Sequence, residues 1–145
     1  MIRSAPRELI ITNGNSAGTL LRHAMSGVEV LPWRDVLHEG PVPVTDSLAD
    51  LTDIRANYLA RDGGDLDQTR TILQARDRGL ASSASFDRIV LWFEHDLYDQ
   101  LQLLQVLDWF SLQREEEGSL RLVQASDFLG NQTPEKHSRL SGTRA

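Results

Sequence analysis

Three ionisable side chains follow one another directly after a short apolar run. Glu94, His95 and Asp96 come immediately after residues 89–93, whose sequence is IVLWF. A run this short, and this rich in β-branched and aromatic residues, predicts a strand that is buried on both faces. Carboxylates and an imidazole at the end of such a strand can serve as general acid and base, or can accept hydrogen bonds from the hydroxyl groups of a ribose. We therefore take these three residues as candidate catalytic groups, with Asp96 the foremost.

A simpler role explains part of this pattern. Asp96 is placed to cap a helix predicted over 97–112, and Asp99, in the first turn of that helix, suits the positive end of the helix dipole. Capping does not explain why Glu94 and His95 directly follow a strand predicted to be buried. Burial beside other carboxylates perturbs pKa values, which favours a functional site here.

A second polar segment follows the first predicted strand, residues 8–12. The chain turns there into a predicted helix through four residues, Asn13, Gly14, Asn15 and Ser16. Backbone N–H groups at a helix N-terminus bind phosphate or carboxylate well. The segment has no Walker lysine and is not G-x-G-x-x-G, so the alternative is a tight turn with Ser16 as its N-cap. We assign the four residues as candidate contacts for a small anionic ligand.

The loop after the second predicted strand carries a third polar group. Trp33 ends the strand beside a proline, and Asp35 and His38 follow in the loop over 34–44. An aromatic side chain at a strand end can stack a base or a sugar ring, although aromatics beside apolar strands are more often part of the core. Trp33, Asp35 and His38 are therefore further candidate ligand contacts.

Metal and thiol chemistry receive less support. Two histidines and a carboxylate, here His38, His95 and Asp96, can form a metal triad. Their spacing matches neither H-E-x-x-H nor another recognised ligand pattern, so we assign no metal ligands and keep a metal-dependent hydrolase as an alternative. The chain has no cysteine, which excludes disulfides, thiolate metal sites and a cysteine nucleophile.

Strands and helices alternate along the chain, and their order decides whether the three polar groups meet. Strands are predicted over 8–12, 28–33, 89–93 and 119–125, and helices over 17–25, 47–61, 65–80 and 97–112. This order fits an α/β fold of three layers with a mostly parallel sheet of order 2-1-3-4, a flavodoxin-like or Rossmann-like half. The ends of the first and third strands would then face one another at the switch point, and all three polar groups would line one cleft at the carboxyl edge.

The helix over 97–112 is apolar nearly all round. Its polar residues recur every third position in a narrow stripe, Asp99, Gln102, Gln105 and Asp108. A helix of this kind is usually buried on several sides. We expect its cover to be the helix over 47–61 or a second copy of the chain, with a homodimer the favoured outcome.

Composition bounds the remaining classes. The chain has 145 residues and a net charge of -6, and 14 of its 15 basic residues are arginines. Nonspecific nucleic-acid binders need a basic face, so the acidic balance argues against a nucleic-acid partner. No apolar run is long enough to span a membrane, and the N-terminus lacks the pattern of a signal peptide. We therefore expect a cytoplasmic protein.

The three polar segments belong to longer motifs. These are TNGNS at 12–16, LPWRDVLHEGPVP at 31–43 and LWFEHDLYDQL at 91–101. Through them the chain resembles domain-of-unknown-function family 1835, a family of uncharacterised bacterial proteins. The resemblance covers roughly residues 8–135. It brings no established activity, so it strengthens the location of a site and leaves its chemistry open.

The chain departs from that family at two positions and at its end. Family members usually carry Asp where this chain has Asn15, and often His where it has Ile10. Many continue into a further helical region, whereas the match fades near His137 here. We expect a single α/β domain over 1–130, followed by a loosely ordered tail over 131–145 that is truncated relative to the family.

Three hypotheses for the function follow. The first is a protein that binds, or also turns over, a small phosphorylated or nucleotide-like ligand at the carboxyl edge of the sheet. The second is a noncatalytic interaction or regulatory module that uses the apolar helix over 97–112. The third is the metal-dependent hydrolase. Whether the protein is an enzyme, and which cofactor it would use, stays open at this stage.

Overall fold

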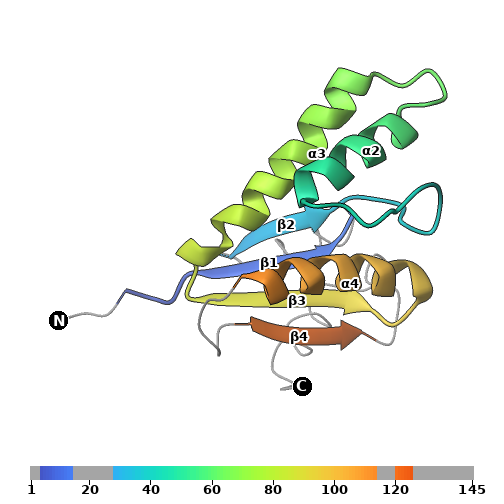
Figure 1. The fold of residues 1–145 in the computed structure, drawn as a ribbon. Helices are drawn as coiled ribbons and strands as arrows, with labels where there is room; N and C mark the ends of the chain where they lie inside the picture. Colours follow the sequence, from blue (N-terminus) through green and yellow to red (C-terminus); the bar gives the residue numbers. More distant parts are fainter. Residues whose placement is uncertain (1–3, 15–27, 114–119, 126–145) are drawn as a thin grey trace.

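The computed structural model describes residues 4–14, 28–113 and 120–125 (Figure 1). Four strands in this part form one sheet: β1 (Glu8–Asn13), β2 (Glu29–Trp33), β3 (Arg88–Glu94) and β4 (Leu120–Ala125). They lie in the order β2-β1-β3-β4, and every neighbouring pair is parallel. The predicted α/β fold and the sheet order 2-1-3-4 are confirmed. This order is that of the first four strands of a flavodoxin-like sheet.

The apolar run over 89–93 forms the interior of the sheet. Strand β3 pairs with β1 on one side and with β4 on the other, and all five residues of the run are buried. Successive side chains point to opposite faces, as a strand requires. Leu91 and Phe93 join the core beneath the helices, whereas Val90 and Trp92 join a second apolar cluster with Ile10. The prediction of an interior strand is confirmed.

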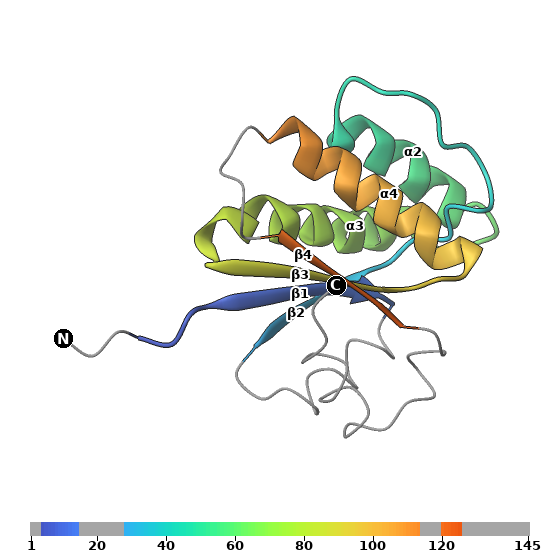
Figure 2. The same cartoon turned by 90° about the horizontal axis from the view of Figure 1, so that it is seen from below.

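Three helices cover one face of this sheet: α2 (Leu48–Leu59), α3 (Leu66–Ala81) and α4 (Leu97–Leu112) (Figures 1 and 2). A short 3-10 turn (Ser82–Ser85) follows α3 and leads into β3. The helix predicted over 17–25 and the tail over 131–145 lie outside the described residues, and so does the third layer that this helix would form. None of the described helices combines the length and apolar character needed to cross a membrane.

Side-chain caps set the helix starts. Each helix begins after a residue whose side-chain oxygen accepts a hydrogen bond from the backbone N–H three residues later, namely Ser47, Asp65 and Asp96. These distances are 3.1, 3.0 and 3.0 Å. Such a cap stabilises a helix by about 1 kcal/mol. The sequence therefore located all three starts to within a residue.

Helix α4 buries part of its polar stripe and leaves part of its apolar surface exposed. Leu103 and Val106 enter the core, and the polar residues Asp99 and Gln102 are buried as well. Leu104, in contrast, is 62% exposed. The outward side of α4 thus keeps several large apolar side chains, and the homodimer that would cover them stays a prediction.

A buried ion pair fixes the loop between β2 and α2. The side chains of Arg55 and Asp35 are both 0% exposed, and their closest N–O distance is 2.7 Å. The Arg55 guanidinium also donates to the backbone carbonyls of Val36, Glu39 and Pro41 at 2.7 to 3.1 Å. One side chain therefore ties four points of a loop that has no regular structure of its own.

Arg55→Met is expected to destabilise the protein by about 3–5 kcal/mol, because it removes the close partner of the buried Asp35 carboxylate, whose other ion pair, with Arg76, is 4.0 Å long. Urea unfolding followed by circular dichroism measures the loss. Arg70→Met is the matched control, since Arg70 pairs with Asp53 at 2.8 Å but is 32% exposed. That change should cost less than about 1 kcal/mol. An Arg55→Met protein as stable as the control would show that the pair does not hold the loop.

Candidate functional site

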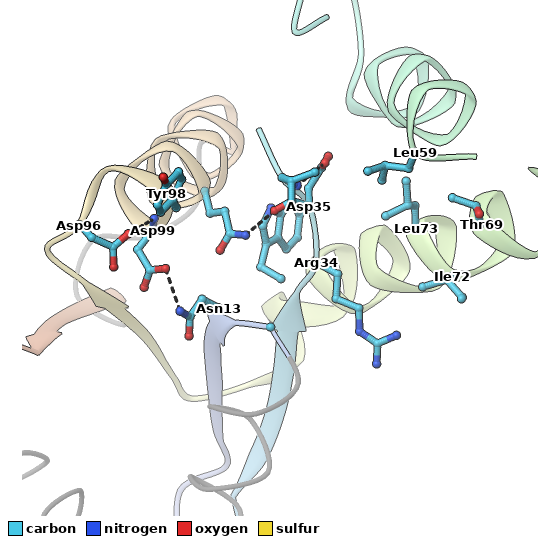
Figure 3. A pocket seen from close by; sticks show the side chains of 14 residues that line it. Asn13, Arg34, Asp35, Leu59, Thr69, Ile72, Leu73, Asp96, Tyr98 and Asp99 are labelled. Atoms are coloured by element: carbon cyan, nitrogen blue, oxygen red, sulfur yellow. Dashed lines mark hydrogen bonds between the residues drawn. The ribbon is translucent and has the colours of Figure 1, made fainter. Parts of the chain in front are cut away.

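A cleft opens where the carboxyl ends of the strands meet the helices (Figure 3). Its volume is about 630 Å³. It is lined by the end of β1, the loop after β2, and parts of α2, α3 and α4. The lining residues are Asn13, Gly14, Trp33, Arg34, Asp35, Val36, Leu59, Thr69, Ile72, Leu73, Asp96, Tyr98, Asp99 and Gln102. The cleft lies at the switch point of the sheet, between β1 and β3, where ligands of such folds bind.

One side of the cleft is built around the carboxylate of Asp99. Its Oδ1 accepts a hydrogen bond from Asn13 Nδ2 at 2.7 Å, and its Oδ2 accepts one from the backbone N–H of Glu94 at 2.6 Å. Asn13 ends β1, Glu94 ends β3, and Asp99 lies in the first turn of α4. A single buried carboxylate therefore joins the two central strands to the helix.

Asp96 combines the two roles that the sequence left open. Its Oδ1 accepts the backbone N–H of Asp99 at 3.0 Å, so it is the N-cap of α4. Its side chain also lines the cleft. Glu94, Asp96 and Asp99 can each offer one carboxylate oxygen to a common centre, because these oxygens lie within 4.8 Å of one another. Three acids therefore lie close together at the start of α4.

The environment of Asp99 alters its acidity. Burial raises the pKa of this carboxyl above its ordinary value of 3.8, and the nearby negative charge of Asp96 raises it further. The hydrogen bonds from Glu94 and Asn13 oppose this shift and do not cancel it. A carboxyl group with a perturbed pKa in a cleft is a candidate functional group.

Because its pKa is raised in the folded protein, Asp99 binds a proton more readily there than in the unfolded chain. Wild type should therefore lose stability relative to Asp99→Asn as pH rises from 3.8 through the raised pKa. Urea unfolding of both proteins across this range, in metal-free buffer, measures the difference. Asp108→Asn, an exposed position on the same helix, controls for the loss of one negative charge. A difference that grows in favour of wild type with rising pH would contradict the burial of Asp99.

Two amide groups present unpaired oxygens beside these acids. Gln102 Nε2 donates to the backbone carbonyl of Asp35 at 2.6 Å, and Asn13 Nδ2 donates to Asp99. A backbone carbonyl and an ionised carboxylate only accept hydrogen bonds, so each amide must face its acceptor with its nitrogen. The amide oxygen of each residue therefore points away from that acceptor. Gln102 Oε1 and Asn13 Oδ1 are buried and have no hydrogen-bond partner within the described chain. Each such acceptor favours a ligand that offers a donor or a cation.

The opposite wall of the cleft is apolar. It consists of Leu59 from α2 and of Ile72 and Leu73 from α3. Figure 3 shows these side chains on the far side of the cleft from Asp96 and Asp99. The cleft can therefore hold a molecule with one flat or apolar part and one polar part.

Five of the ten predicted site residues line the cleft: Asn13, Gly14, Trp33, Asp35 and Asp96. Asn15 and Ser16 lie outside the described residues. The remaining three, Glu94, His95 and His38, do not line the cleft, although a carboxylate oxygen of Glu94 lies within 4.8 Å of oxygens of Asp96 and Asp99. Asn13 and Asp96 share one cleft, as the predicted convergence of the strand ends requires.

Two of the five lining residues are already engaged within the protein. Trp33 is 0% exposed, its Nε1 donates to Gln105 Oε1 at 2.8 Å, and the Arg76 guanidinium lies 4.1 Å from its ring centre. Its ring is therefore a packed wall and not an open stacking surface. Asp35 is likewise committed, because its carboxylate is held by Arg55.

His38 and His95, the histidines in the described residues, do not assemble into a metal triad. His38 lies 3.6 Å from the Glu39 carboxylate and packs its ring on that of Tyr98, while His95 is exposed after the strand end. In the part of the chain that the structure describes, the group of side chains that could hold a metal ion is Glu94, Asp96 and Asp99. The set of His38, His95 and Asp96 does not form such a group there, and the metal-dependent hydrolase stays a prediction.

Sequence reasoning also missed lining residues. Asp99 and Gln102 were signalled by the polar stripe on an otherwise apolar helix, since such a stripe faces either solvent or a polar cleft. Residues 14–18, GNSAG, also spell G-x-S-x-G, the nucleophile-elbow pattern of a strand-to-helix turn. Gly14 has the positive φ of 47° that suits such a turn, and Ser16 lies outside the described residues.

Comparisons with known proteins add little. No family model matches the chain, and no curated protein matches it. Among solved structures, the crystal structure of a ketoreductase domain from the bacillaene assembly line is similar, with 12% identity and a TM-score of 0.38. The match covers 97% of this chain and 29% of that chain. A likeness this distant carries no argument, and the resemblance to family 1835 stays a prediction.

Proposed function

We propose that the cleft binds a small phosphorylated, nucleotide-like ligand. The observation that supports this most is the pairing of an apolar wall with a row of acceptor oxygens across one cleft at the switch point of a parallel sheet. A volume of about 630 Å³ lies within the range of small-molecule sites. A nucleotide has the matching division, with a flat base at one end and hydroxyl and phosphate groups at the other.

The lining residues suggest how such a ligand lies. The base packs on Leu59, Ile72 and Leu73, and the sugar hydroxyls donate to acceptors on α4, of which Gln102 Oε1 and Asp96 are the nearest available. The phosphate end points towards Asn13 and Gly14, the start of the segment predicted to bind an anion. In this arrangement Asp96 is also the group best placed to move a proton, should the ligand be turned over.

A thermal-shift screen against nucleotides and sugar phosphates tests the proposal. A ligand present at a hundred times its Kd adds about 2.7 kcal/mol to the stability, so a true ligand gives a clear shift. Ile72→Glu should abolish the shift, since it places a charge in the apolar wall at a site already 39% exposed. Leu104→Glu, a matched change outside the cleft, should leave it intact. A shift that survives Ile72→Glu would place the ligand elsewhere.

Asp96→Asn separates capping from chemistry. Asparagine caps a helix as well as aspartate does, so the stability of the free protein should change little. Asparagine cannot accept a proton, so any turnover of the bound ligand should fall by about 10²–10⁴-fold while binding of the base persists. Turnover of the screened ligand, measured beside Asp108→Asn, gives the comparison. Unchanged turnover in Asp96→Asn would leave Asp96 as a cap alone.

The outward side of α4 supports a second candidate function, the interaction module. Leu97, Leu104 and Leu112 are 66%, 62% and 70% exposed and recur along one side of the helix. A stripe of this kind fits a second copy of the chain, since two-fold dimers are the commonest assembly. Light scattering at micromolar concentration should then report a dimer that Leu104→Glu converts to a monomer. A wild-type monomer would remove this candidate.

A further inference from the structure

The polar side of the cleft poses an electrostatic problem for any phosphorylated ligand. Asp96 and Asp99 line it, and the buried Glu94 lies beside them. Arg34 also lines the cleft, but its side chain extends away from Asp96 and Asp99 in Figure 3. A phosphate placed at Asn13 would lie beside carboxylates of its own sign, and like charges at such distances repel.

We propose that Glu94, Asp96 and Asp99 bind a divalent cation such as Mg²⁺ or Ca²⁺. The cation site stands on the geometry of these residues. Its role as the bridge between the protein and a phosphate rests on the proposed function.

The spacing of the carboxylate oxygens fits such an ion. Metal–oxygen distances are about 2.1 Å for Mg²⁺ and about 2.4 Å for Ca²⁺, so oxygens on opposite sides of the ion lie about 4.2 and 4.8 Å apart. The three carboxylate oxygens lie within 4.8 Å of one another, which is the separation that Ca²⁺ spans, and Mg²⁺ would need them to close by up to about 0.6 Å. Carboxylate and amide oxygens are also the hard ligands that these cations prefer.

A second observation, independent of the acids, points to the same ligand. Gln102 is 8% exposed, and its Oε1 has no hydrogen-bond partner in the described chain. It lies three residues after Asp99, and therefore on the same side of α4, and it lines the same cleft. The amide oxygen of Asn13 is also buried and unpaired, and the nitrogen of that amide is bonded to Asp99. Acceptors of this kind suit a cation directly or a water molecule bound to it.

Helix capping leaves enough oxygen atoms for the ion. The cap uses Oδ1 of Asp96, and each oxygen of Asp99 accepts one hydrogen bond. A carboxylate offers about four lone-pair sites, so both groups keep sites for a metal. Within the described residues, neither Asp96 nor Asp99 forms an ion pair with an arginine or a histidine that would neutralise it.

The bridging role follows from the chemistry of Mg²⁺ in proteins. This ion is usually held by one or two carboxylates, with substrate phosphates and waters in its remaining positions. The cleft supplies the carboxylates at its polar end, next to Asn13 and Gly14. A phosphate there would meet a positive ion in place of bare acids.

The test uses the full chain and Mn²⁺ alone. Electron paramagnetic resonance detects free Mn²⁺, and its signal should fall until one ion is bound per chain. Asp96→Asn, which keeps the helix cap, should weaken Mn²⁺ binding about tenfold or more. Asp108→Asn is the matched control on the same helix and should bind as wild type does. No binding by wild type at millimolar Mn²⁺, or equal binding by the two variants, would overturn the site.

A second arm separates this inference from the proposed function. The nucleotide that gives the largest thermal shift is titrated calorimetrically with Mg²⁺ and then with EDTA. Binding that weakens at least about tenfold in EDTA supports the bridge. Nucleotide binding that is indifferent to EDTA overturns the bridge and leaves the proposed function standing. Mn²⁺ binding that depends on Asp96, without binding of any nucleotide, keeps the cation site and removes the nucleotide.

Discussion

The walls of the cleft are held together by one ion pair and two hydrogen bonds to Arg34 and Asp35, the two residues that follow β2. The Asp35 carboxylate pairs with Arg55 of α2, its backbone carbonyl accepts from Gln102 of α4, and the carbonyl of Arg34 accepts from Arg76 of α3. Three helices that are far apart in the sequence are therefore bonded to two consecutive residues. The apolar wall and the polar side of the cleft keep their spacing because both are tied to this point. Loss of the buried pair would loosen both walls at once.

Helix α4 shows how a polar stripe can be the inner side of a helix. Asp99, Gln102 and Gln105 bond to Asn13, to Asp35 and to Trp33, whereas Leu104 faces outward. Burying amides and carboxylates is costly unless their hydrogen bonds are made, and here most of them are. The helix position is thus fixed by directional bonds as well as by packing, which suits a surface that must hold a ligand.

The fold could be predicted because its signals are local and consistent. The apolar run over 89–93 predicts a central strand, and the caps Ser47, Asp65 and Asp96 mark helix starts. The end of β1 and the start of α4 meet because parallel strands share a carboxyl edge. The roles of Trp33 and Asp35 could not be predicted, because their partners, Gln105 and Arg55, are distant in sequence and show no spacing that links them. The exposure of His95 could not be predicted, because the apolar run does not show that the strand ends at Glu94 and that the chain bends at the next residue.

The charge at the start of α4 exceeds what capping requires. A helix N-terminus carries the equivalent of about +0.5 charge, so one carboxylate already more than balances it. Glu94, Asp96 and Asp99 bring three acids to that end. The raised pKa of Asp99 comes first from its burial, and the negative charge of Asp96 adds to it against two hydrogen bonds to the carboxylate. A proton relieves the surplus in part, and a divalent cation would relieve it more fully while also drawing in a phosphate. The three acids at the start of α4 would therefore favour a cation there over an anion.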